Sequence, residues 1–261
     1  MFRISLLLLS SLGCLASFTL ARDIPDNVRS LYDSIKGNRE CSNILQDGFT
    51  ALYDESSDFA YCQGQNGVIY LQGTSGTLAD MDIDCDGVQG SQADDGRCGN
   101  SGDTHSITSF ADTVASYGQG PDDLDANIHP YVVFGNEGSK DGYVNFDPRE
   151  YGIEPLGVMG VVCGDQLIYG VWGDTNGDDG PAAMVGEASI SLATACFGSG
   201  ITGDNGYSDL DVLYIAFPGS SAVPGAAGAD WAAGNFDDFE ASIESLGDRL
   251  ISQLSRCCLG T

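Results

Sequence analysis

The sequence predicts a mainly β protein, a distorted β-barrel or sandwich with short N- and C-terminal helices, stapled by disulfide bonds. Short runs of β-branched and aromatic residues recur between clusters of turn residues, which is the pattern of an all-β domain. Glycine, a strong marker of turns, occurs 36 times in 261 residues. Of the nine cysteines, eight follow residue 21, and an even number is typical of disulfide-bonded exported proteins. The choice between barrel and sandwich stays open.

The first 21 residues have the features of a secretory signal peptide. Arg3 provides the positive end, an apolar run begins at Ile4, and small residues lead to Ala21. Charged residues follow at once, and the apolar run is too short to span a bilayer. We therefore expect a signal peptide at residues 1–21 and a secreted, extracellular protein. No linker or internal repeat divides the remainder, so residues 22–261 are expected to form a single domain and to act as a monomer.

The charge balance is strongly acidic, with 38 Asp and Glu against 10 Lys and Arg and a net charge of −28. Such a surface repels nucleic acid and anionic membranes and attracts polycations, although acidity can also serve solubility alone. The chain has no phosphate-binding loop, dinucleotide fingerprint or His-Glu-x-x-His zinc motif, so we expect no cofactor and no metal. If all the cysteines are paired, carboxylates are the remaining candidates for catalysis.

Helical spacing of apolar residues is confined to a few segments. It occurs over residues 22–37 and 235–254, and Asn235 can cap the second of these helices. A shorter helical piece is expected within 107–117. That piece lies inside a long loop over residues 89–125, which is rich in Gly, Asp and Ser, and long loops in compact domains are often functional.

Strands are expected where β-branched and aromatic residues cluster or alternate with small ones. The Gly164-Asp165 pair predicts a tight hairpin between two of these strands. The expected strands cover residues 67–71, 129–136, 157–163, 166–172, 188–193 and 211–217.

Residues 78–87 place an aspartate at every second position. On a strand, this alternation puts the carboxylates on one face and the apolar side chains on the other. Three interpretations stay open: an anionic wall that binds ammonium groups, a calcium loop that begins at Asp82, and a solvated strand face. The calcium loop would need a glutamate where Ala93 stands, and flanking helices that the pattern lacks. The cationic ligand ranks first, which makes Asp82 and Asp84 candidate substrate-binding residues.

A strand, a polar loop and a second strand follow one another over residues 166–193. Asp174 stands at the end of the first strand and Glu187 at the start of the second, with turn residues between them. A loop that returns the chain can bring the two ends to face each other. Two facing carboxylates with room between them are what hydrolysis of a glycosidic bond requires. Each acid alone would be read as a turn or surface residue, so the pairing carries the interpretation.

Four segments carry a family resemblance. They read DMDIDCDG from Asp80, HPYVVFGN from His129, GVVCGDQLIYGVWGDTNGDD from Gly160 and VGEASISLATACF from Val185. Together they resemble the fungal secreted chitosanases of glycoside hydrolase family 75, and the resemblance covers essentially the whole chain after the signal peptide.

The resemblance implies a single catalytic domain that cleaves the β-1,4 bonds of chitosan, a polycationic glucosamine polymer, by endo-hydrolysis with inversion. It also implies that Asp174 and Glu187 are the essential acidic pair. Because free 2-amino groups offer no acetamide oxygen for substrate-assisted cleavage, the protein must supply both acid and base. We expect Glu187 to be the general acid, kept protonated by partial burial, and Asp174 to be the general base that holds a water. Exchange of the two roles stays open.

Aromatic residues near Asp174 are candidates for stacking on sugar rings. Trp172 precedes Asp174 by two positions and is expected to share its strand face, whereas Tyr169 is expected to point into the core. Trp172, Asp82 and Asp84 are therefore the candidate substrate-binding residues. Two other functions stay open: a non-catalytic extracellular module that binds calcium or polycations, and hydrolysis of a neutral β-glucan.

Overall fold

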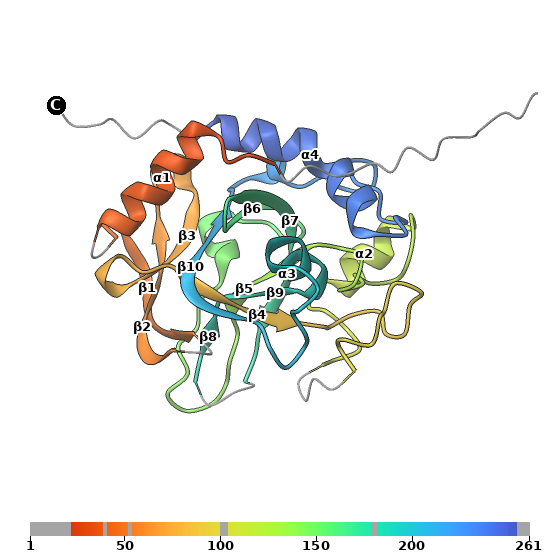
Figure 1. The fold of residues 1–261 in the computed structure, drawn as a ribbon, viewed down its shortest axis with the longest axis horizontal. Helices are drawn as coiled ribbons and strands as arrows, with labels where there is room; N and C mark the ends of the chain where they lie inside the picture. The colour runs from red at the N-terminus through yellow and green to blue at the C-terminus, as the bar shows by residue number, and fades with distance from the viewer. Residues whose placement is uncertain (1–21, 39–40, 52–53, 100–103, 179–181, 255–261) are drawn as a thin grey trace, which may run out of the picture.

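The computed structural model describes residues 22–38, 41–51, 54–99, 104–178 and 182–254, apart from the side chains of 54–57. In this part of the chain, ten strands form one hydrogen-bonded sheet that four α-helices accompany (Figure 1). The protein is therefore mainly β, as the sequence predicts.

Six strands of the sheet close into a ring. Their bounds are β4 Ala79–Asp84, β5 Tyr131–Asn136, β6 Val158–Cys163, β7 Gln166–Asn176, β9 Glu187–Ser189 and β10 Tyr207–Ala216. Neighbours pair in the order β4-β9-β5-β7-β6-β10, and β10 pairs back with β4. The β4–β9 and β5–β7 pairs are parallel, whereas β5–β9 and β6–β7 are antiparallel. In this ring, β9 and β7 both lie next to β5.

Four further strands extend the sheet outward from β10. Their order is β3-β2-β1-β8, and their bounds are β3 Ile69–Gly73, β2 Asp54–Gln63, β1 Ile44–Ala51 and β8 Met184–Val185. The β1–β2 pair lies outside the predicted strands. Its register shifts several times, and such irregular pairing obscures the simple alternation by which a strand is recognised.

The helices are α1 Asp26–Gly37, α2 Ala111–Tyr117, α3 Ile190–Phe197 and α4 Phe236–Ser252. Both predicted terminal helices are confirmed, and the side chain of Asn235 accepts the backbone N–H of Asp238 at the start of α4. α4 packs on β6 and β7. Gly247 makes this approach possible, because a Cβ there would lie 2.5 Å from the ring of Tyr169.

The predicted strand over residues 188–193 is wrong from Ile190 onward. β9 ends at Ser189, whose hydroxyl accepts the backbone N–H of Leu192 and caps α3. Four consecutive residues of α3, from Ile190 to Ala193, are buried. A helix that is buried on most sides lacks a clear apolar stripe, so its sequence resembles a buried strand.

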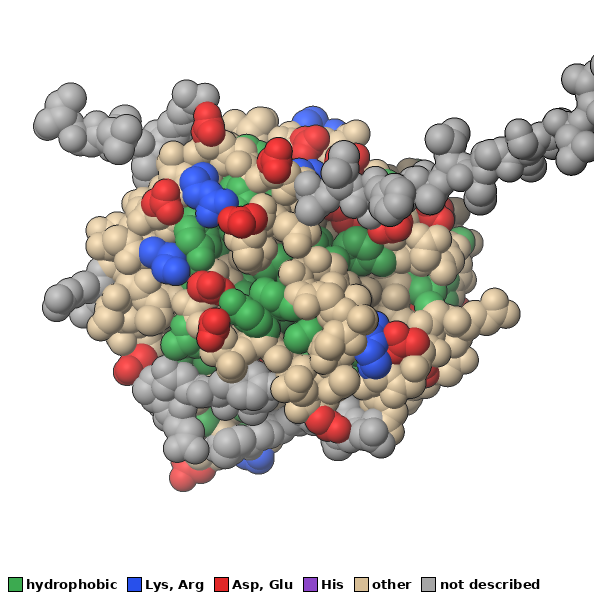
Figure 2. All heavy atoms as spheres, viewed as in Figure 1, with side chains coloured by type: hydrophobic (Ala, Val, Ile, Leu, Met, Phe, Trp, Pro, Cys, Tyr) green, Lys and Arg blue, Asp and Glu red, His purple; other side chains and the backbone are tan. Residues whose placement is uncertain are grey.

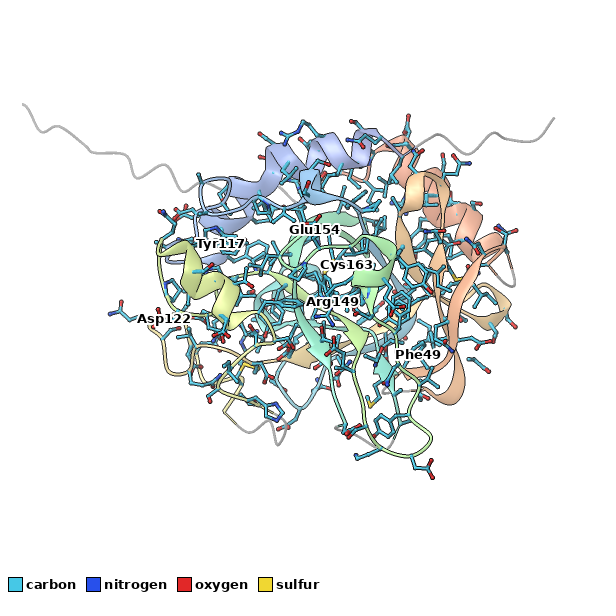
Figure 3. All side chains as sticks on the ribbon, turned by 180° about the vertical axis from the view of Figure 1, so that it is seen from behind. Phe49, Tyr117, Asp122, Arg149, Glu154 and Cys163 are labelled. Carbon is cyan, nitrogen blue, oxygen red and sulfur yellow. A yellow bond between two sulfur atoms is a disulfide. The ribbon has the colours of Figure 1, made fainter. Side chains whose placement is uncertain are left out.

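Three disulfides join segments that are distant in sequence. They pair Cys41 with Cys62, Cys85 with Cys98, and Cys163 with Cys196. Side chains fill the interior around Cys163, as the view from behind shows (Figure 3). The sequence also has adjacent cysteines at 257 and 258, which predicts that each reaches a different partner rather than the other; both lie outside the described residues.

The surface carries its acidic residues in a dispersed way. Figure 2 shows carboxylates spread over one face among polar and apolar groups, with few Lys and Arg side chains. None of the described helices is both long enough and apolar enough to cross a bilayer.

Candidate active site

Asp174 and Glu187 lie on the two strands that flank β5. Val133 is opposite Asp174 in the β5–β7 pair and opposite Glu187 in the β5–β9 pair. Residues opposite each other across a ladder share a face, so both carboxylates are on the same side of the sheet. Strands two apart are separated by roughly 10 Å. The structure therefore brings the two predicted carboxylates together, with one strand between them.

A β-bulge directs the side chain of Asp174. On β5, Val132 pairs with Trp172 and the next residue pairs with Asp174, so Gly173 is an extra residue on β7. Only glycine fits at that point, because a Cβ would lie 2.5 Å from the Cβ of Tyr131. Successive residues of β5 face opposite sides of the sheet. Trp172 and Asp174 therefore face opposite sides as well.

The prediction that Trp172 stacks on a sugar ring is wrong for this reason. The residue is only 1% exposed, and its ring packs edge-on against Phe110 at 4.9 Å between centroids. Its indole N–H donates to the backbone oxygen of Asp174 at 2.9 Å. Trp172 thus anchors the main chain of the site from the core side. Tyr169 is also buried, as the sequence predicts.

Asp174 is 5% exposed and receives three hydrogen bonds, all on Oδ1. The donors are the backbone N–H and hydroxyl of Ser109, at 2.9 and 2.5 Å, and the backbone N–H of Thr175 at 2.7 Å. Burial raises the pKa of Asp174, and the charge of Asp123 adds to this effect. The hydrogen bonds act in the opposite direction because they stabilise the ionised form. The net pKa remains above the ordinary value.

Two further aspartates approach Asp174 from the end of β4. Carboxylate oxygens of Asp84, Asp86 and Asp174 all lie within 4.8 Å of one another. Because β9 and β5 separate β4 from β7 in the ring, this proximity shows that the strands curve toward each other. Asp84 is 6% exposed. Its pKa is raised well above the usual value by burial and by the charges of Glu187, Asp174 and Asp86.

Asp86 is less buried than Asp84 and has a histidine beside it. Burial raises the pKa of Asp86 to about 6, while hydrogen bonds from His105 oppose the rise. One oxygen of Asp86 lies 3.2 Å from the His105 Nδ1, and the other accepts the His105 backbone N–H at 2.5 Å. The cluster thus contains several carboxyl groups and one partly exposed imidazole.

The spacing of Asp84, Asp86 and Asp174 is close enough to admit a divalent cation. Carboxyl groups that share a proton lie equally close, so the spacing by itself does not define a metal site. The calcium loop considered from the sequence has no EF-hand form here. Asp82 lies within β4, and the described residues between 85 and 110 contain no helix.

The aspartate row does not form a solvated strand face. Asp80 is 0% exposed and Asp84 is 6% exposed, which rules out that interpretation. The burial of Asp84 also differs from the open anionic wall that the sequence suggested. Asp84 is about as buried as Asp174 and more buried than Asp86. Asp82 is partly exposed and opposite Glu187 in the β4–β9 pair. Asp82 is therefore the more accessible of the two predicted substrate-binding aspartates.

Ser109 and Tyr131 belong to the site but were not singled out from the sequence. The Tyr131 hydroxyl donates to the backbone oxygen of Asp86 at 3.1 Å, and burial together with the nearby charge of Asp84 raises its pKa. Ser109 lies in the long loop that was expected to be functional, which was the one available signal. No spacing rule connects either residue to Asp174.

His129 is a structural residue. It is 1% exposed, and its Nδ1 accepts the backbone N–H of Asp125 at 2.8 Å. Its other ring nitrogen lies 3.2 Å from the backbone oxygen of Trp231. Burial lowers the pKa of His129, so the imidazole is neutral and serves to join two segments of the core.

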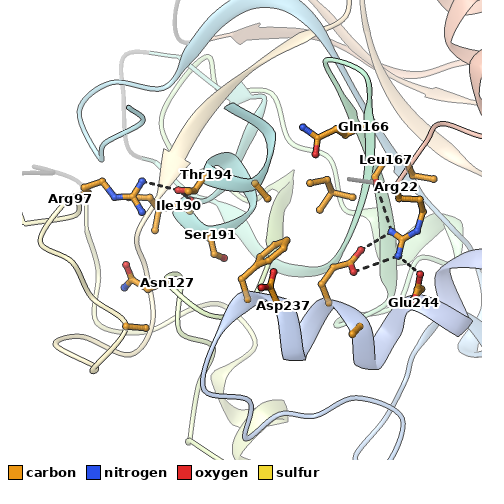
Figure 4. A pocket seen from close by; sticks show the side chains of 16 residues that line it. Arg22, Arg97, Asn127, Gln166, Leu167, Ile190, Ser191, Thr194, Asp237 and Glu244 are labelled. Carbon is orange, nitrogen blue, oxygen red and sulfur yellow. Dashed lines mark hydrogen bonds and ion pairs between the residues drawn. The ribbon is translucent and has the colours of Figure 1, made fainter. Parts of the chain in front are cut away.

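A cavity of about 570 Å³ lies elsewhere, between α3, α4 and the start of β7 (Figure 4). Arg97 and Thr194 line one part of it, and Arg22 with Glu240 lines another. None of the carboxylates around Asp174 lines this cavity. The size of a cavity therefore does not identify the reactive groups of this molecule.

Comparison with known proteins agrees with the resemblance. Residues 81–253 match the family described as "Fungal chitosanase of glycosyl hydrolase group 75". This segment begins within β4 and includes all of α4. It contains the carboxylates of Asp82, Asp84, Asp86, Asp174 and Glu187.

Several fungal proteins are similar over nearly the whole chain. An endo-chitosanase of Aspergillus oryzae is 45% identical over 244 residues, which cover 92% of this chain and 95% of that protein. Endo-chitosanase B of the same species is 44% identical over 238 residues, 90% of this chain and 92% of that protein. An endo-chitosanase of Aspergillus fumigatus is 44% identical, with coverages of 90% and 92%. The chain therefore belongs to the fungal chitosanases of glycosyl hydrolase group 75.

Proposed function

We propose that the protein is a secreted endo-acting chitosanase that hydrolyses the β-1,4 bonds of chitosan with inversion. The observation that carries this proposal is the common register of Asp174 and Glu187 with Val133. It puts two carboxylates on one face of the sheet with a strand between them. An inverting glycosidase needs its two carboxyl groups about 6.5–9.5 Å apart, so that a water fits beside the sugar. A separation of roughly 10 Å between the two backbones suits that gap.

Asp174 is proposed as the general base. Its three hydrogen bonds favour the ionised carboxylate, and all of them end on Oδ1. Oδ2 can then accept a hydrogen bond from the attacking water. Glu187 is proposed as the general acid that protonates the leaving oxygen. It is more exposed than Asp174, as a group that donates a proton to the substrate must be.

The substrate follows from charge and from the relatives. The similar Aspergillus proteins are named endo-chitosanases, and a net charge of −28 attracts a polycation. Asp82, which is opposite Glu187, is proposed to bind a glucosamine ammonium group next to the acid. Asp84 is buried, so it is proposed to make no direct contact with the substrate and to act only through the neighbouring carboxyl groups.

The proposal includes the organisation of the chain. Residues 1–21 serve as a signal peptide, and residues 22–261 form a single catalytic domain that acts as a monomer without a cofactor. Three disulfides suit an oxidising, extracellular location. The acidic surface opposes binding to nucleic acid or to anionic membranes.

Side-by-side assays of chitosan, chitin and a neutral β-glucan test the substrate. We expect reducing sugar to be released rapidly from chitosan alone, and comparable release from the glucan would overturn the substrate assignment. Proton NMR of the first products tests the mechanism, since inversion of a β bond yields the α-anomer first. Initial appearance of the β-anomer would overturn inversion. Addition of a chelator distinguishes an enzyme without a metal from a calcium-dependent module, which would lose thermal stability.

A further inference from the structure

Ser109 supplies two of the three hydrogen bonds that Asp174 receives. Its hydroxyl oxygen lies 2.5 Å and its backbone nitrogen 2.9 Å from Oδ1. The third donor, the Thr175 backbone, belongs to β7 itself and bonds to the same oxygen. Ser109 is therefore the one side chain, among the described hydrogen-bond donors to Asp174, that comes from another part of the chain. It lies 65 residues away in sequence.

A buried clamp fixes the backbone on which Ser109 stands. The carboxylate of Asp123 accepts the backbone N–H and the hydroxyl of Thr108, at 2.8 and 2.6 Å, and the backbone N–H of Leu124 at 2.7 Å. Thr108 is 3% exposed and Asp123 is 7% exposed. The backbone N–H of Val88 also donates to the oxygen of Leu124. The segment is thus held immediately before Ser109 and is joined to the chain that leaves β4.

Acidic groups surround Asp174 on several sides. The titratable groups that face it or its nearest carboxyl neighbours are Asp84 and Asp86 at the end of β4, Asp123, Tyr131 on β5, Glu187 on β9, and His105 beside Asp86. The like charges of the acids disfavour the ionised form of Asp174. The hydrogen bonds from Ser109 favour it, because a donor stabilises the carboxylate more than the neutral acid.

We propose that Ser109 is a positioning residue for the general base, which holds Oδ1 of Asp174 so that the carboxylate stays ionised and Oδ2 faces the attacking water. This inference rests on the proposed function, in which Asp174 is the base. Ser109 does not exchange a proton with the substrate in this scheme. The Asp123–Thr108 clamp holds the backbone next to Ser109, and the Ser109 hydroxyl is thereby kept in place beside Asp174.

Kinetics of Ser109→Ala over a range of pH test the proposal. The variant loses the hydroxyl but keeps the backbone N–H, so we expect kcat on chitosan to fall about tenfold while KM changes little, since hydrogen bonds to charged groups are among the stronger ones. The acidic limb of the kcat profile should move to higher pH, because Asp174 protonates more readily without the donor. Ser109→Thr retains a hydroxyl and should restore the position of the limb.

Ser106→Ala is the matched control, since Ser106 is exposed in the same segment and is expected to leave kcat and the limb unchanged. Thr108→Val is a second variant that removes one bond of the clamp and keeps the shape of the side chain. It should move the limb in the same direction by a smaller amount. This variant also supplies the test if Ser109→Ala does not fold.

The results separate this inference from the proposed function. If Asp174→Asn is inactive but Ser109→Ala has wild-type kcat and an unmoved limb, the role of Ser109 is overturned and the general base stands. A lower kcat with an unmoved limb also overturns it, because a purely structural defect has that signature. If Asp174→Asn keeps wild-type turnover, the proposed function itself fails.

Discussion

The two ends of β7 carry acidic clusters in opposite settings. At the Gln166 end, Arg22 lies 2.7 Å from Glu240 and 2.8 Å from Glu244 (Figure 4). It also lies 3.9 Å from Asp248. At the other end, Asp174 is close to Asp84 and Asp86, and the described contacts place no Lys or Arg beside them. The first cluster has a guanidinium that pairs with its carboxylates, whereas the second has no such cation among its described contacts and must reduce its charge by keeping protons.

This difference distinguishes structural acids from reactive acids. A carboxylate paired with arginine stays ionised and holds two segments together. A buried carboxyl among other carboxyls has a raised pKa and can exchange a proton near neutral pH. The arginine cluster lines the cavity of about 570 Å³, and the reactive cluster does not. Unbalanced charge, rather than cavity size, marks the chemistry in this molecule.

The largest expected effect comes from removal of the reactive acids. Asp174→Asn and Glu187→Gln should each lower kcat on chitosan by roughly 10²–10⁴-fold or more, because general acid and base catalysis is lost. Release of reducing sugar measures the effect, and circular dichroism checks the fold. Glu244→Gln, at the arginine end, is the matched control and should keep near wild-type kcat. Near wild-type turnover in either of the first two variants would remove that residue from the mechanism.

Disruption of the arginine cluster should affect stability instead. Arg22→Met leaves Glu240, whose side chain is 16% exposed, next to Glu244 without its cation, and it also removes the guanidinium above the Tyr169 ring. We expect a loss of about 2 kcal/mol in unfolding free energy, less than for a fully buried pair. The melting temperature should fall by roughly 4–8 °C, while kcat per folded molecule stays unchanged.

Arg29→Met is the control for this variant, since its ion pair with Asp165 is 3.6 Å long and exposed, and such pairs contribute little. If kcat per folded molecule also fell in Arg22→Met, the arginine cluster would contribute to catalysis. The distinction between structural acids at one end of β7 and reactive acids at the other would then fail.

Asp84→Asn tests the proton retained in the reactive cluster. The pKa of Asp84 is raised in the folded protein, so its protonated form favours folding. That contribution is fully present below the unfolded pKa of about 3.9 and is lost as the pH rises toward the folded pKa. An asparagine resembles the neutral acid at every pH. The variant should therefore gain in melting temperature relative to wild type as the pH rises from 4 to 7.

Thermal unfolding at pH 4 and at pH 7 measures this difference. If the melting temperature of Asp84→Asn were further below that of wild type at pH 7 than at pH 4, ionised Asp84 would stabilise the fold, contrary to the proposal. Asp165→Asn, which alters an exposed acid, should show no comparable dependence on pH.

The parts of the fold that depend on neighbouring residues follow from the sequence. Both terminal helices have local apolar spacing, and Asn235 caps the second of them. The Gly164-Asp165 turn joins β6 to β7 as predicted, with Cys163 opposite Gln166. Closure of the ring through β4 and β10 does not follow, because it joins Ala79 to Val212, and no local pattern encodes a pairing over such a distance. Local preferences were also insufficient at Ser189, where the strand ends and the serine hydroxyl caps the helix that follows.

The site was predictable to the extent that it lies close in sequence. Asp174 and Glu187 flank a single loop, so their approach could be anticipated. Ser109 could not be connected to them, since its position depends on a clamp from Asp123. Trp172 was misplaced because a one-residue bulge depends on registration with β5, and a shift of one residue reverses the face of every side chain beyond it.

Trp172→Phe gives the smallest expected effect and tests whether the bulge separates the two faces. Phenylalanine retains a ring against Phe110 but loses the N–H that bonds to the Asp174 oxygen. Loss of one such bond should lower the unfolding free energy by about 1 kcal/mol. Since the backbone of Asp174 is less firmly held, kcat should fall a few-fold, whereas KM for chitosan should remain within about twofold. A stacking residue in the cleft would behave in the opposite way, with a higher KM at a nearly constant kcat, and that result would return Trp172 to the substrate-binding surface.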